Sequence, residues 1–460
     1  MVAVLLDGDA VTSLEGFRSS GGGKAFAAAR LLDPAVIIEE ITASGLRGRG
    51  GGAFPVGKKW AGIRAAGPGR RYAVCNAAEG EPGTFKDRTL LRHNPYRVLE
   101  GLAIAAHAVG AEAAYIATKA SYQHEAEAIA RAIEELRSDG LLGNLPITLV
   151  LGPDEYLFGE EKALLEVIEG NDPLPRLLPP YEQGLFATDI QTGWQAVDAP
   201  AGTTGNGAPN PTLVNNVESL AHVPRIVLDG AAWFRSLGTA DSPGTTIATI
   251  VGDVRRSFVA EIELGTSLAS LIEQAGGPLP GRTLQAAFSG VANAVIPADR
   301  FDVPLSYEGL AAIGSGLGSA GFILYDDTAC MVEVAHTLSR FLYVESCGQC
   351  RSCKFGTGEI TRSLDALLTS EASEQEVEVI GARLRSVTDQ TRCYLAAEEQ
   401  VMVASILREF PEEFALHLEG RCSVEPRTIS VPKLVDIANG VATYDETQVR
   451  KQPDWTYADG

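Results

Sequence analysis

The chain has 460 residues, and its 38 basic and 59 acidic side chains give a formal net charge of −21. This charge argues against a nucleic-acid-binding surface, because phosphate recognition needs clustered Lys and Arg; a hydrophobic fraction of 45% argues against a disordered chain. No basic segment followed by an apolar run opens the sequence, and its most apolar stretch, residues 102–116, is too short to span a bilayer. We therefore expect a cytoplasmic protein without direct membrane insertion.

The first half of the chain alternates between patterns typical of helices and of strands. Apolar residues at helical spacing and capping residues predict helices at residues 34–44, 94–109, 126–136 and 160–169. Short apolar runs predict strands at residues 72–75, 114–118 and 147–151. Because helices connect successive strands, we expect an α/β fold with a largely parallel sheet covered on both faces.

The second half of the chain changes in character. Residues 187–211 are rich in Gly, Thr, Pro and Asn and predict a long surface loop. From residue 245 onward, short strand patterns, several glycines and one helix near residues 267–275 predict a small α+β module. After Asp326 the pattern predicts helices, whereas residues 421–460 are polar and irregular.

Cysteines supply the first indication of chemistry. Three of the seven lie in Cys347-Gly-Gln-Cys350-Arg-Ser-Cys353, and Cys393 follows further along the chain. Three closely spaced thiolates and a distant fourth are typical of a [4Fe–4S] site. Zinc is the alternative, although structural zinc sites more often pair two CxxC motifs. Cys75, Cys330 and Cys422 have no other cysteine at short spacing in the sequence, so we assign them no chemistry.

Residues 44–60 hold six glycines and four cationic side chains. Such a stretch presents backbone N–H groups and positive charge, which suit a phosphate or a flat cofactor. It is not a dinucleotide fingerprint, because it follows a helix and lacks the expected downstream acid, and no complete P-loop motif occurs. A flexible surface loop is the alternative.

Two acidic loops, residues 76–83 and 152–161, follow predicted strands. Ligands collect beyond the carboxyl ends of parallel strands, so we expect these loops to converge with the glycine-rich loop. Capping of a helix is the alternative role for Glu160 and Glu161. The pair Asn215-Asn216 is equally consistent with a turn.

In combination these motifs resemble the NADH-oxidising flavoprotein subunit of respiratory complex I and its relatives in soluble hydrogenases and formate dehydrogenases. The resemblance extends over nearly the whole chain up to Cys422. It depends on Gly45-Leu-Arg-Gly-Arg-Gly-Gly51, Phe85-Lys-Asp-Arg88, Gly159-Glu-Glu161, Pro211-Thr-Leu-Val-Asn-Asn-Val-Glu218, Ser306-Tyr-Glu308, Glu345-Ser-Cys-Gly-Gln-Cys350 and Cys393.

The resemblance implies three sets of site residues and no catalytic side chain, since the flavin performs the hydride transfer. The implied FMN-site residues are Gly48, Arg49, Gly50, Gly51, Lys59, Asn76, Glu79, Tyr156, Gly159, Glu160, Asn215 and Asn216. The implied NAD(H)-site residues are Phe54, Glu81, Glu161 and Tyr181. The implied [4Fe–4S] ligands are Cys347, Cys350, Cys353 and Cys393.

Several positions depart from the family pattern near the nucleotide. Ala78 stands where the family usually has Asp, and Leu178 where it usually has Lys. Tyr181 replaces a Phe, Gly52-Ala53 inverts the usual order, and the loop at residues 187–209 is longer than usual. The alternative function is therefore an FMN/[4Fe–4S] subunit that has lost NADH binding and exchanges electrons with ferredoxin or a membrane partner. A scaffold that keeps only the cluster is a third reading, against which the retained flavin loop argues.

The resemblance also implies a domain order and partners. We expect an FMN/NADH-binding Rossmann-like domain at residues 1–240, a ubiquitin-like β-grasp domain at 241–325, a helical [4Fe–4S] bundle at 326–420 and a tail at 421–460. The implied partners are a [2Fe–2S] thioredoxin-like subunit and a multi-cluster iron–sulfur or catalytic subunit. The implied location is the cytoplasm, including the cytoplasmic face of a membrane complex.

Overall fold

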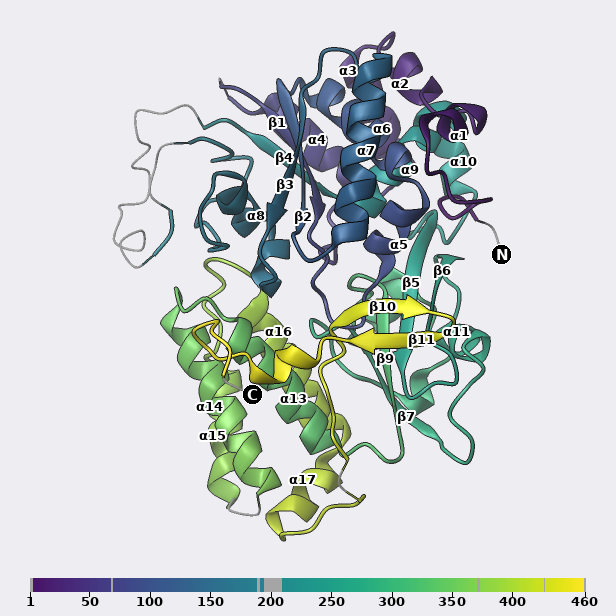
Figure 1. Cartoon of the computed structure of the whole chain (residues 1–460). Helices are drawn as coiled ribbons and strands as arrows, with labels where there is room; N and C mark the ends of the chain where they lie inside the picture. Colours follow the sequence, from purple (N-terminus) through teal and green to yellow (C-terminus); the bar gives the residue numbers. More distant parts are fainter. Residues whose placement is uncertain are drawn as a thin grey trace. The chain divides into compact units, whose positions relative to one another are not determined.

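The computed structural model describes residues 3–67, 69–187, 191–193, 209–369, 373–425 and 427–458 (Figure 1). The chain divides into two compact units. The first comprises Met1–Gly80, Lys86–Ile247 and Ala260–Gly265, and the second comprises Glu81–Phe85, Ala248–Val259 and Thr266–Gly460.

The first unit is an α/β structure around a four-stranded sheet. Its strands are β1 (Tyr72–Ala77), β2 (Ala113–Lys119), β3 (Ile147–Gly152) and β4 (Thr212–Asn216). Its helices are α1 (Leu14–Ser19), α2 (Lys24–Ala29), α3 (Pro34–Ser44), α4 (Val56–Ala65), α5 (Lys86–His93), α6 (Pro95–Val109), α7 (Gln123–Asp139), η1 (Tyr156–Gly159), α8 (Glu161–Ile168), α9 (Val217–Asp229) and α10 (Ala231–Arg235). The strand order is β3-β2-β1-β4, and every pairing is parallel, which confirms the expected parallel sheet.

Local capping chemistry sets the ends of the helices. The Asp33 side chain accepts a hydrogen bond from the backbone N–H of Ala35, and α3 ends at Gly45, whose φ is 74°. The Asn94 side chain caps α6 in the same way through Arg97 N. Asn and Asp are preferred at this position because they satisfy an N–H group that the helix leaves unpaired. The predicted helices at residues 34–44 and 94–109 are thereby confirmed.

Residues 245–326 form a five-stranded mixed sheet with the order β6-β5-β9-β7-β8. Its elements are β5 (Thr245–Gly252), β6 (Phe258–Glu263), α11 (Leu268–Gln274), β7 (Leu284–Ser289), β8 (Ile296–Pro297), η3 (Ala298–Arg300), α12 (Tyr307–Ala312) and β9 (Gly321–Asp326). β9 is central, since it pairs with β5 in parallel and with β7 in antiparallel orientation. The helix predicted near residues 267–275 is confirmed as α11, which Ser267 caps.

Helices follow β9 along the chain in the second unit, as predicted after Asp326. They are α13 (Met331–Glu345), α14 (Arg351–Leu368), α15 (Glu374–Leu384), α16 (Leu395–Glu409) and α17 (Pro411–Leu418). α13 packs against α14 and α16, and α14 packs against α15. Among the described helices of both units, none is long and apolar enough to cross a membrane.

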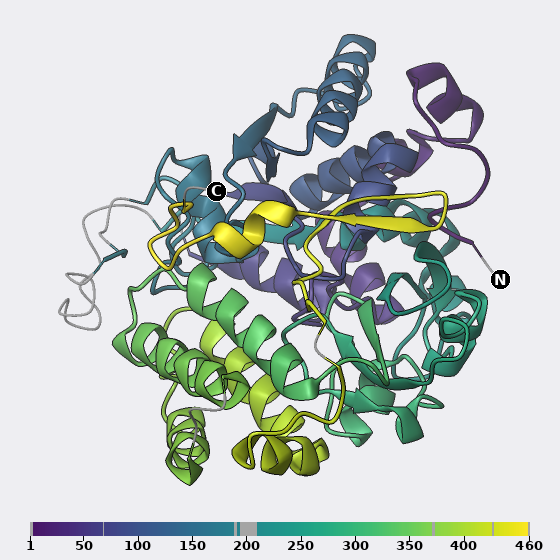
Figure 2. The same cartoon turned by 60° about the horizontal axis from the view of Figure 1, so that its bottom comes forward.

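The tail is more regular than expected. β10 (Leu434–Ala438) and β11 (Val441–Tyr444) form an antiparallel hairpin, drawn in yellow in Figures 1 and 2, and η4 (Glu446–Arg450) follows. Asn439 and Gly440 make the turn with φ values of 52° and 82°. Asn-Gly favours this turn because both positions need a positive φ. The expectation of an irregular tail is therefore wrong for residues 434–450.

Candidate functional site

The carboxyl ends of β1 and β4 form the centre of the candidate site in the first unit. The chain builds β1, β2 and β3 toward one side and then returns to place β4 on the other side of β1. Asn76 is paired in register with Asn216, and Cys75 with Asn215. Open parallel sheets bind ligands at the point where the strand order reverses. The Asn215-Asn216 pair thus lies at the position expected of a ligand site.

The glycine-rich loop is held against the end of β4. Arg49 N donates a hydrogen bond to Ser219 Oγ at 2.8 Å, and the Arg49 guanidinium donates to Thr245 O at 3.0 Å. A Cβ atom on Gly50 would lie only 3.2 Å from Asn216 Cβ. Gly51 has φ 108°, and open space surrounds the position where a Cβ would be. The loop is thus fixed at one side and presents bare backbone at the other, which fits the close approach of a flat cofactor.

α4 connects this loop to the sheet through two side chains. Lys59 Nζ lies 2.5 Å from Glu161 Oε2 and donates to Val214 O at 2.9 Å. Trp60 Nε1, which is fully buried, donates to Asn215 Oδ1 at 2.8 Å. The sequence predicted that these segments converge, and the structure brings them together at the end of β4.

The loop after β1 meets the loop after β3. Asn76 Nδ2 donates to Gly159 O at 2.7 Å, and Asn76 Oδ1 accepts from Ala78 N at 3.2 Å. A Cβ on Gly80 would lie 3.6 Å from the Tyr156 ring, so Tyr156 also borders the loop after β1. Ala78 is buried. Asn76, Tyr156 and Gly159 therefore share one edge of the sheet.

Glu160 and Glu161 have separate roles although they are adjacent. Glu160 caps α8, because its carboxylate accepts from Lys162 N and Ala163 N at 2.8 and 2.9 Å. Burial raises the pKa of Glu160 to about 7. The capping alternative is therefore realised for Glu160, whereas Glu161 contacts the ammonium of Lys59.

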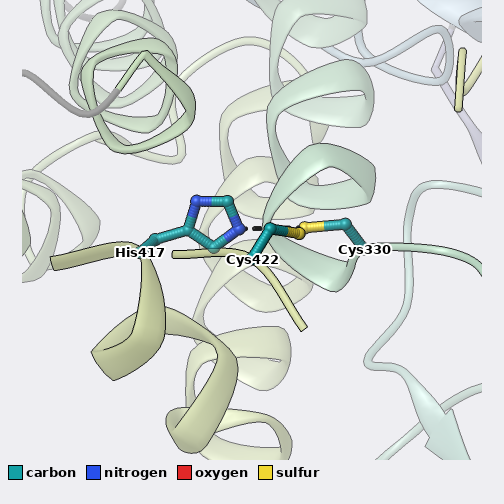
Figure 3. A group of neighbouring side chains, drawn as sticks. All are labelled: Cys330, His417 and Cys422. Atoms are coloured by element: carbon teal, nitrogen blue, oxygen red, sulfur yellow. Dashed lines mark hydrogen bonds between the residues drawn. The ribbon is translucent and has the colours of Figure 1, made fainter. Parts of the chain in front are cut away.

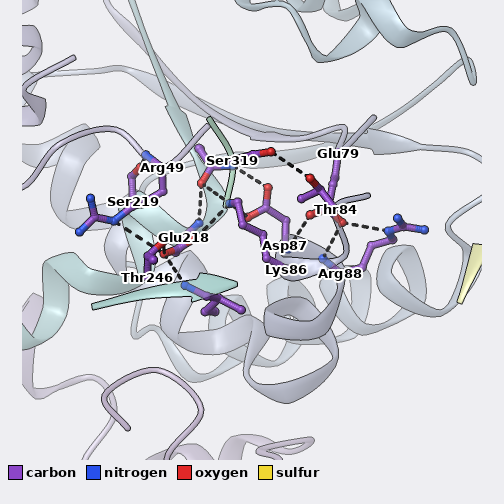
Figure 4. A network of polar contacts seen from close by, with 12 residues as sticks. Arg49, Glu79, Thr84, Lys86, Asp87, Arg88, Glu218, Ser219, Thr246 and Ser319 are labelled. Atoms are coloured by element: carbon purple, nitrogen blue, oxygen red, sulfur yellow. Dashed lines mark hydrogen bonds and ion pairs between the residues drawn. The ribbon is translucent and has the colours of Figure 1, made fainter. Parts of the chain in front are cut away.

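A network of buried charges lies behind the site (Figure 4). Glu79 faces Arg88 at 3.0 Å and also accepts from Asp87 N at 2.9 Å. The Arg88 guanidinium lies over the ring of Tyr122, and its central carbon is 4.5 Å from the ring centroid. The first turn of α5 thus binds the Glu79 carboxylate through Asp87 N and the Arg88 guanidinium.

The same network fixes Asn216. Lys86 Nζ contacts Asp87 Oδ1 at 2.7 Å, Glu218 Oε2 at 3.1 Å and Asn216 Oδ1 at 3.2 Å. Asn216 Nδ2 in turn donates to Asp87 Oδ2 at 2.6 Å. Burial alone would lower the pKa of Lys86, but the carboxylates of Asp87 and Glu218 raise it above its ordinary value. Burial raises the pKa of Asp87 to about 7, against the opposing effect of Lys86.

Lys86, Asp87 and Glu218 belong to quoted motifs, but sequence reasoning gave them no role. All three are buried, although charged side chains are mostly exposed in folded proteins. The order Lys-Asp-Arg directly after a loop at a strand end was the available signal, because buried charges need partners of opposite sign.

The predicted nucleotide residues are more exposed and more scattered. Phe54 and Tyr181 are 56% and 54% exposed, which leaves their rings open for stacking, and Leu178 is 40% exposed. Glu81 belongs to the second unit, where its carboxylate accepts from Val291 N at 2.6 Å. Of the long loop at 187–209, residues 188–190 and 194–208 lie outside the described residues.

Three of the four predicted cluster cysteines lie at the start of α14. Cys347 lies in the turn after α13, Cys350 is the residue at the N-cap position of α14, and Cys353 is in the first turn of that helix. Ser346 Oγ is 3.2 Å from Cys353 Sγ, and Gln349 Nε2 is 3.6 Å from Cys347 Sγ. Burial raises the pKa of the Cys350 thiol and the nearby Thr391 side chain opposes this, so the segment before Cys393 lies beside the CxxCxxC turn.

All four of these side chains are thiols and not disulfides, and their donor set fits an iron–sulfur cluster. Burial raises the pKa of Cys353 to about 12, and the neighbouring charges of Cys347 and Cys350 act in the same direction. Negative charges on Cys347 and Cys350 therefore oppose a further charge on Cys353, which a cationic centre would offset.

Comparison with known proteins adds independent support. Residues 41–225 match the family model described as the Nuo51 FMN-binding domain, and residues 333–417 match the NADH-ubiquinone oxidoreductase-F iron-sulfur binding region. The chain is 37% identical over 400 residues to the second F-type subunit of NADH-quinone oxidoreductase from Rhizobium meliloti (strain 1021), covering 84% of this chain and 90% of that one.

Two further comparisons agree. The chain is 34% identical over 415 residues to the F-type subunit of NADH-quinone oxidoreductase from Aquifex aeolicus (strain VF5), covering 88% and 91% of the two chains. The crystal structure of NAD+-reducing [NiFe]-hydrogenase in the air-oxidized state matches with a TM-score of 0.75 and 30% identity, covering 92% of this chain and 69% of that one.

Proposed function

We propose that this chain, which belongs to the family of F-type subunits of NADH-quinone oxidoreductase, passes electrons between NADH and a [4Fe–4S] cluster through FMN. Family membership confirms the resemblance seen in the sequence and supports FMN, the [4Fe–4S] cluster and NAD(H) as cofactors. The observation that carries the function is the convergence of the glycine-rich loop, Asn76 and Asn216 at the switch point of the parallel sheet.

The proposed FMN site uses the residues around that switch point. Bound FMN supplies the exchange between a hydride, which carries two electrons, and single electrons. The open backbone at Gly51 lets a ring system approach, while Lys59 offers a positive charge beside the end of β4. Asn215 and Asn216 are held rigid by Trp60 and Lys86, so their amides keep one orientation. No side chain is required as a general base. The remaining residues that we assign to this site are Gly48, Arg49, Gly50, Asn76, Glu79, Tyr156, Gly159 and Glu160.

We assign nucleotide binding to Phe54, Glu81, Glu161 and Tyr181. The exposed rings of Phe54 and Tyr181 offer faces for stacking. The Glu161 carboxylate, next to Lys59, adds negative charge that would disfavour a further phosphate. Hydride transfer requires the nicotinamide ring to be held next to the flavin ring, and contacts of this kind would supply that positioning.

We assign the cluster to Cys347, Cys350, Cys353 and Cys393. A cluster that takes up one electron at a time must pass it onward, so further redox partners are needed. The relatives are subunits of multi-subunit oxidoreductases, so this chain has partner subunits. We propose that these are a [2Fe–2S] thioredoxin-like subunit and a multi-cluster iron–sulfur or catalytic subunit, assembled in the cytoplasm or at the cytoplasmic face of a membrane.

The proposed domain order follows from these assignments. Residues 1–240 would bind FMN and NADH, residues 241–325 form a β-grasp domain, residues 326–420 hold the cluster, and residues 421–460 form the tail. The mixed sheet at residues 245–326 and the helices α13 to α17 support the second and third of these.

An anaerobic NADH titration tests the function directly. We expect NADH to bleach the flavin absorbance and then to give the electron paramagnetic resonance signal of a reduced [4Fe–4S] cluster. Cys393→Ala should lose the cluster signal and keep the flavin bleaching. Protein that carries FMN but neither binds nor is reduced by NADH would support the alternative electron-transfer role. Zinc without acid-labile sulfide would contradict the cluster.

A further inference from the structure

A second group of metal-ligating side chains lies in the second unit. Cys330, His417 and Cys422 place their ligand atoms within 4.8 Å of one another, and Figure 3 shows the imidazole and the two sulfurs directed toward a common point. The sequence interpretation treated both cysteines as isolated, and this was wrong. Cys330 and His417 are 87 positions apart in the chain, so no local spacing indicated their contact.

Hydrogen bonds prepare the imidazole as a ligand. His417 Nδ1 lies 3.1 Å from Leu367 O, and because a carbonyl only accepts, Nδ1 carries the proton. Nε2 therefore presents its lone pair, and it lies 3.2 Å from Cys330 Sγ. Metal-binding histidines in proteins commonly use one ring nitrogen in this way while a backbone carbonyl orients the other.

Cys330 is the N-cap residue of α13. The start of a helix stabilises negative charge. Glu413, one turn before His417 on α17, accepts a hydrogen bond from Met331 N at 2.7 Å and holds the two helices together at this point.

A simple thiol–imidazole hydrogen bond explains two of the three side chains but leaves Cys422 unexplained. A tetrahedral Zn²⁺ ion explains all three. With Zn–S and Zn–N bonds of about 2.3 and 2.0 Å, tetrahedral angles separate sulfur and nitrogen by about 3.5 Å, close to the arrangement of Cys330 and His417. Two thiolates and a neutral imidazole also balance the charge of the ion, which suits a site where Cys330 and His417 are buried.

We propose that Cys330, His417 and Cys422 bind one Zn²⁺ ion, with a water molecule at the fourth position. Two thiolates and one imidazole suit zinc better than magnesium or calcium, which prefer oxygen ligands. Cys422 is exposed, so the side of the site that it contributes is open to solvent. The ion would tie together the start of α13, the end of α17 and the beginning of the tail.

Metal analysis of the protein, purified anaerobically with its iron–sulfur cluster, tests this proposal. We expect about one zinc per chain in addition to the cluster iron. Cys422→Ser and His417→Ala should each lose the zinc and retain the iron. Cys347→Ser should lose iron and retain zinc, and Cys75→Ala should retain both metals. Because Cys422 is exposed, its replacement is a safe test even if variants of Cys330 fail to fold.

Two further measurements sharpen the test. Cobalt substitution should give the visible bands of a tetrahedral cobalt–thiolate site in the wild-type protein and not in Cys422→Ser. Hydrogen exchange in the segment after Cys422 should become faster in that variant. Absence of zinc, zinc that persists in both ligand variants, or an intact mass lower by two hydrogen atoms, which identifies a Cys330–Cys422 disulfide, would overturn the proposal.

Discussion

Lys59 Nζ lies 2.5 Å from Glu161 Oε2, so a cation beside the glycine-rich loop is paired with an anion at the start of α8. The same ammonium donates to Val214 O on β4. Both side chains are only partly buried, and the pair therefore contributes little to stability by itself. Its importance lies in position, because it places opposite charges side by side where we propose that the flavin and the nucleotide bind.

The first prediction concerns this lysine. We expect Lys59→Met to weaken FMN binding by about tenfold to 150-fold, because a hydrogen bond to a charged group contributes about 1.5–3 kcal/mol. Quenching of FMN fluorescence during titration of the apoprotein measures the affinity. Lys58→Met is the matched control, since Lys58 is the exposed neighbour on the same helix. An equal loss in both variants would show that Lys59 has no specific contact.

The second prediction concerns the nucleotide. Leu178 is partly exposed and supplies no charge, although its backbone N–H is held by Gln191 Oε1 at 2.9 Å. We expect Leu178→Lys to tighten NADH binding by about tenfold or more, because it adds a charge-assisted contact. Leu178→Met is the control for a change of shape without charge. Equilibrium titration with NADH distinguishes them, and identical affinities would reject the role of this position.

The third prediction concerns the tail and the cluster. Lys451 Nζ lies 2.9 Å from each carboxylate oxygen of Glu345, and both side chains are buried. Glu345 ends α13, two residues before Cys347, and Lys354 Nζ also donates to Pro453 O at 2.5 Å. We expect Lys451→Met to remove the cation beside the buried Glu345 carboxylate, which keeps a hydrogen bond from Gln448 Nε2 at 3.0 Å, at a cost of about 3–5 kcal/mol. The cluster should then release iron to a chelator faster under anaerobic conditions.

A compensating change supplies the control for this prediction. An apolar pair of similar volume often replaces a buried ion pair without loss of stability. Adding Glu345→Leu to Lys451→Met should therefore restore slow iron release. Fast release in both proteins would indicate that the charge of Glu345 acts on the cluster itself.

The fourth prediction is a pH dependence of stability. Glu399 is fully buried on α16, its carboxyl group accepts from Ser339 Oγ at 2.6 Å, and burial raises its pKa to about 8. The folded protein thus keeps a proton that the unfolded chain releases near pH 4.5. The stability that this group contributes is complete below about pH 4.5 and is lost as the pH rises to about 8.

Glu399→Gln tests this dependence, because the amide is neutral at every pH. We expect the melting temperature of the variant to exceed that of the wild type increasingly between about pH 5 and pH 8. Glu378→Gln, an exposed position on α15, should show no such trend. A constant difference across this range would contradict a raised pKa for Glu399.

Local interactions explain why much of the fold could be predicted from the sequence. The helix at residues 34–44 was predicted with both ends correct, because Asp33 and Gly45 act within a few residues of their own position. The hairpin at Asn439-Gly440 has an equally local cause, and the sequence interpretation missed it because it treated residues 421–460 together as polar, although the flanking strands are largely apolar. The parallel sheet followed from the alternation of helices and strands.

The sequence by itself therefore determined most of the elements, their order, the family and the CxxCxxC motif, since caps, periodicity and motif spacing are properties of neighbouring residues. Tertiary structure alone decided which charges are buried and which distant side chains meet. Lys86 meets Glu218, Glu345 meets Lys451, and Cys330 meets His417 and Cys422. Each of these contacts joins segments that are far apart in the chain, so it exists only because the helices and strands between them pack in one arrangement.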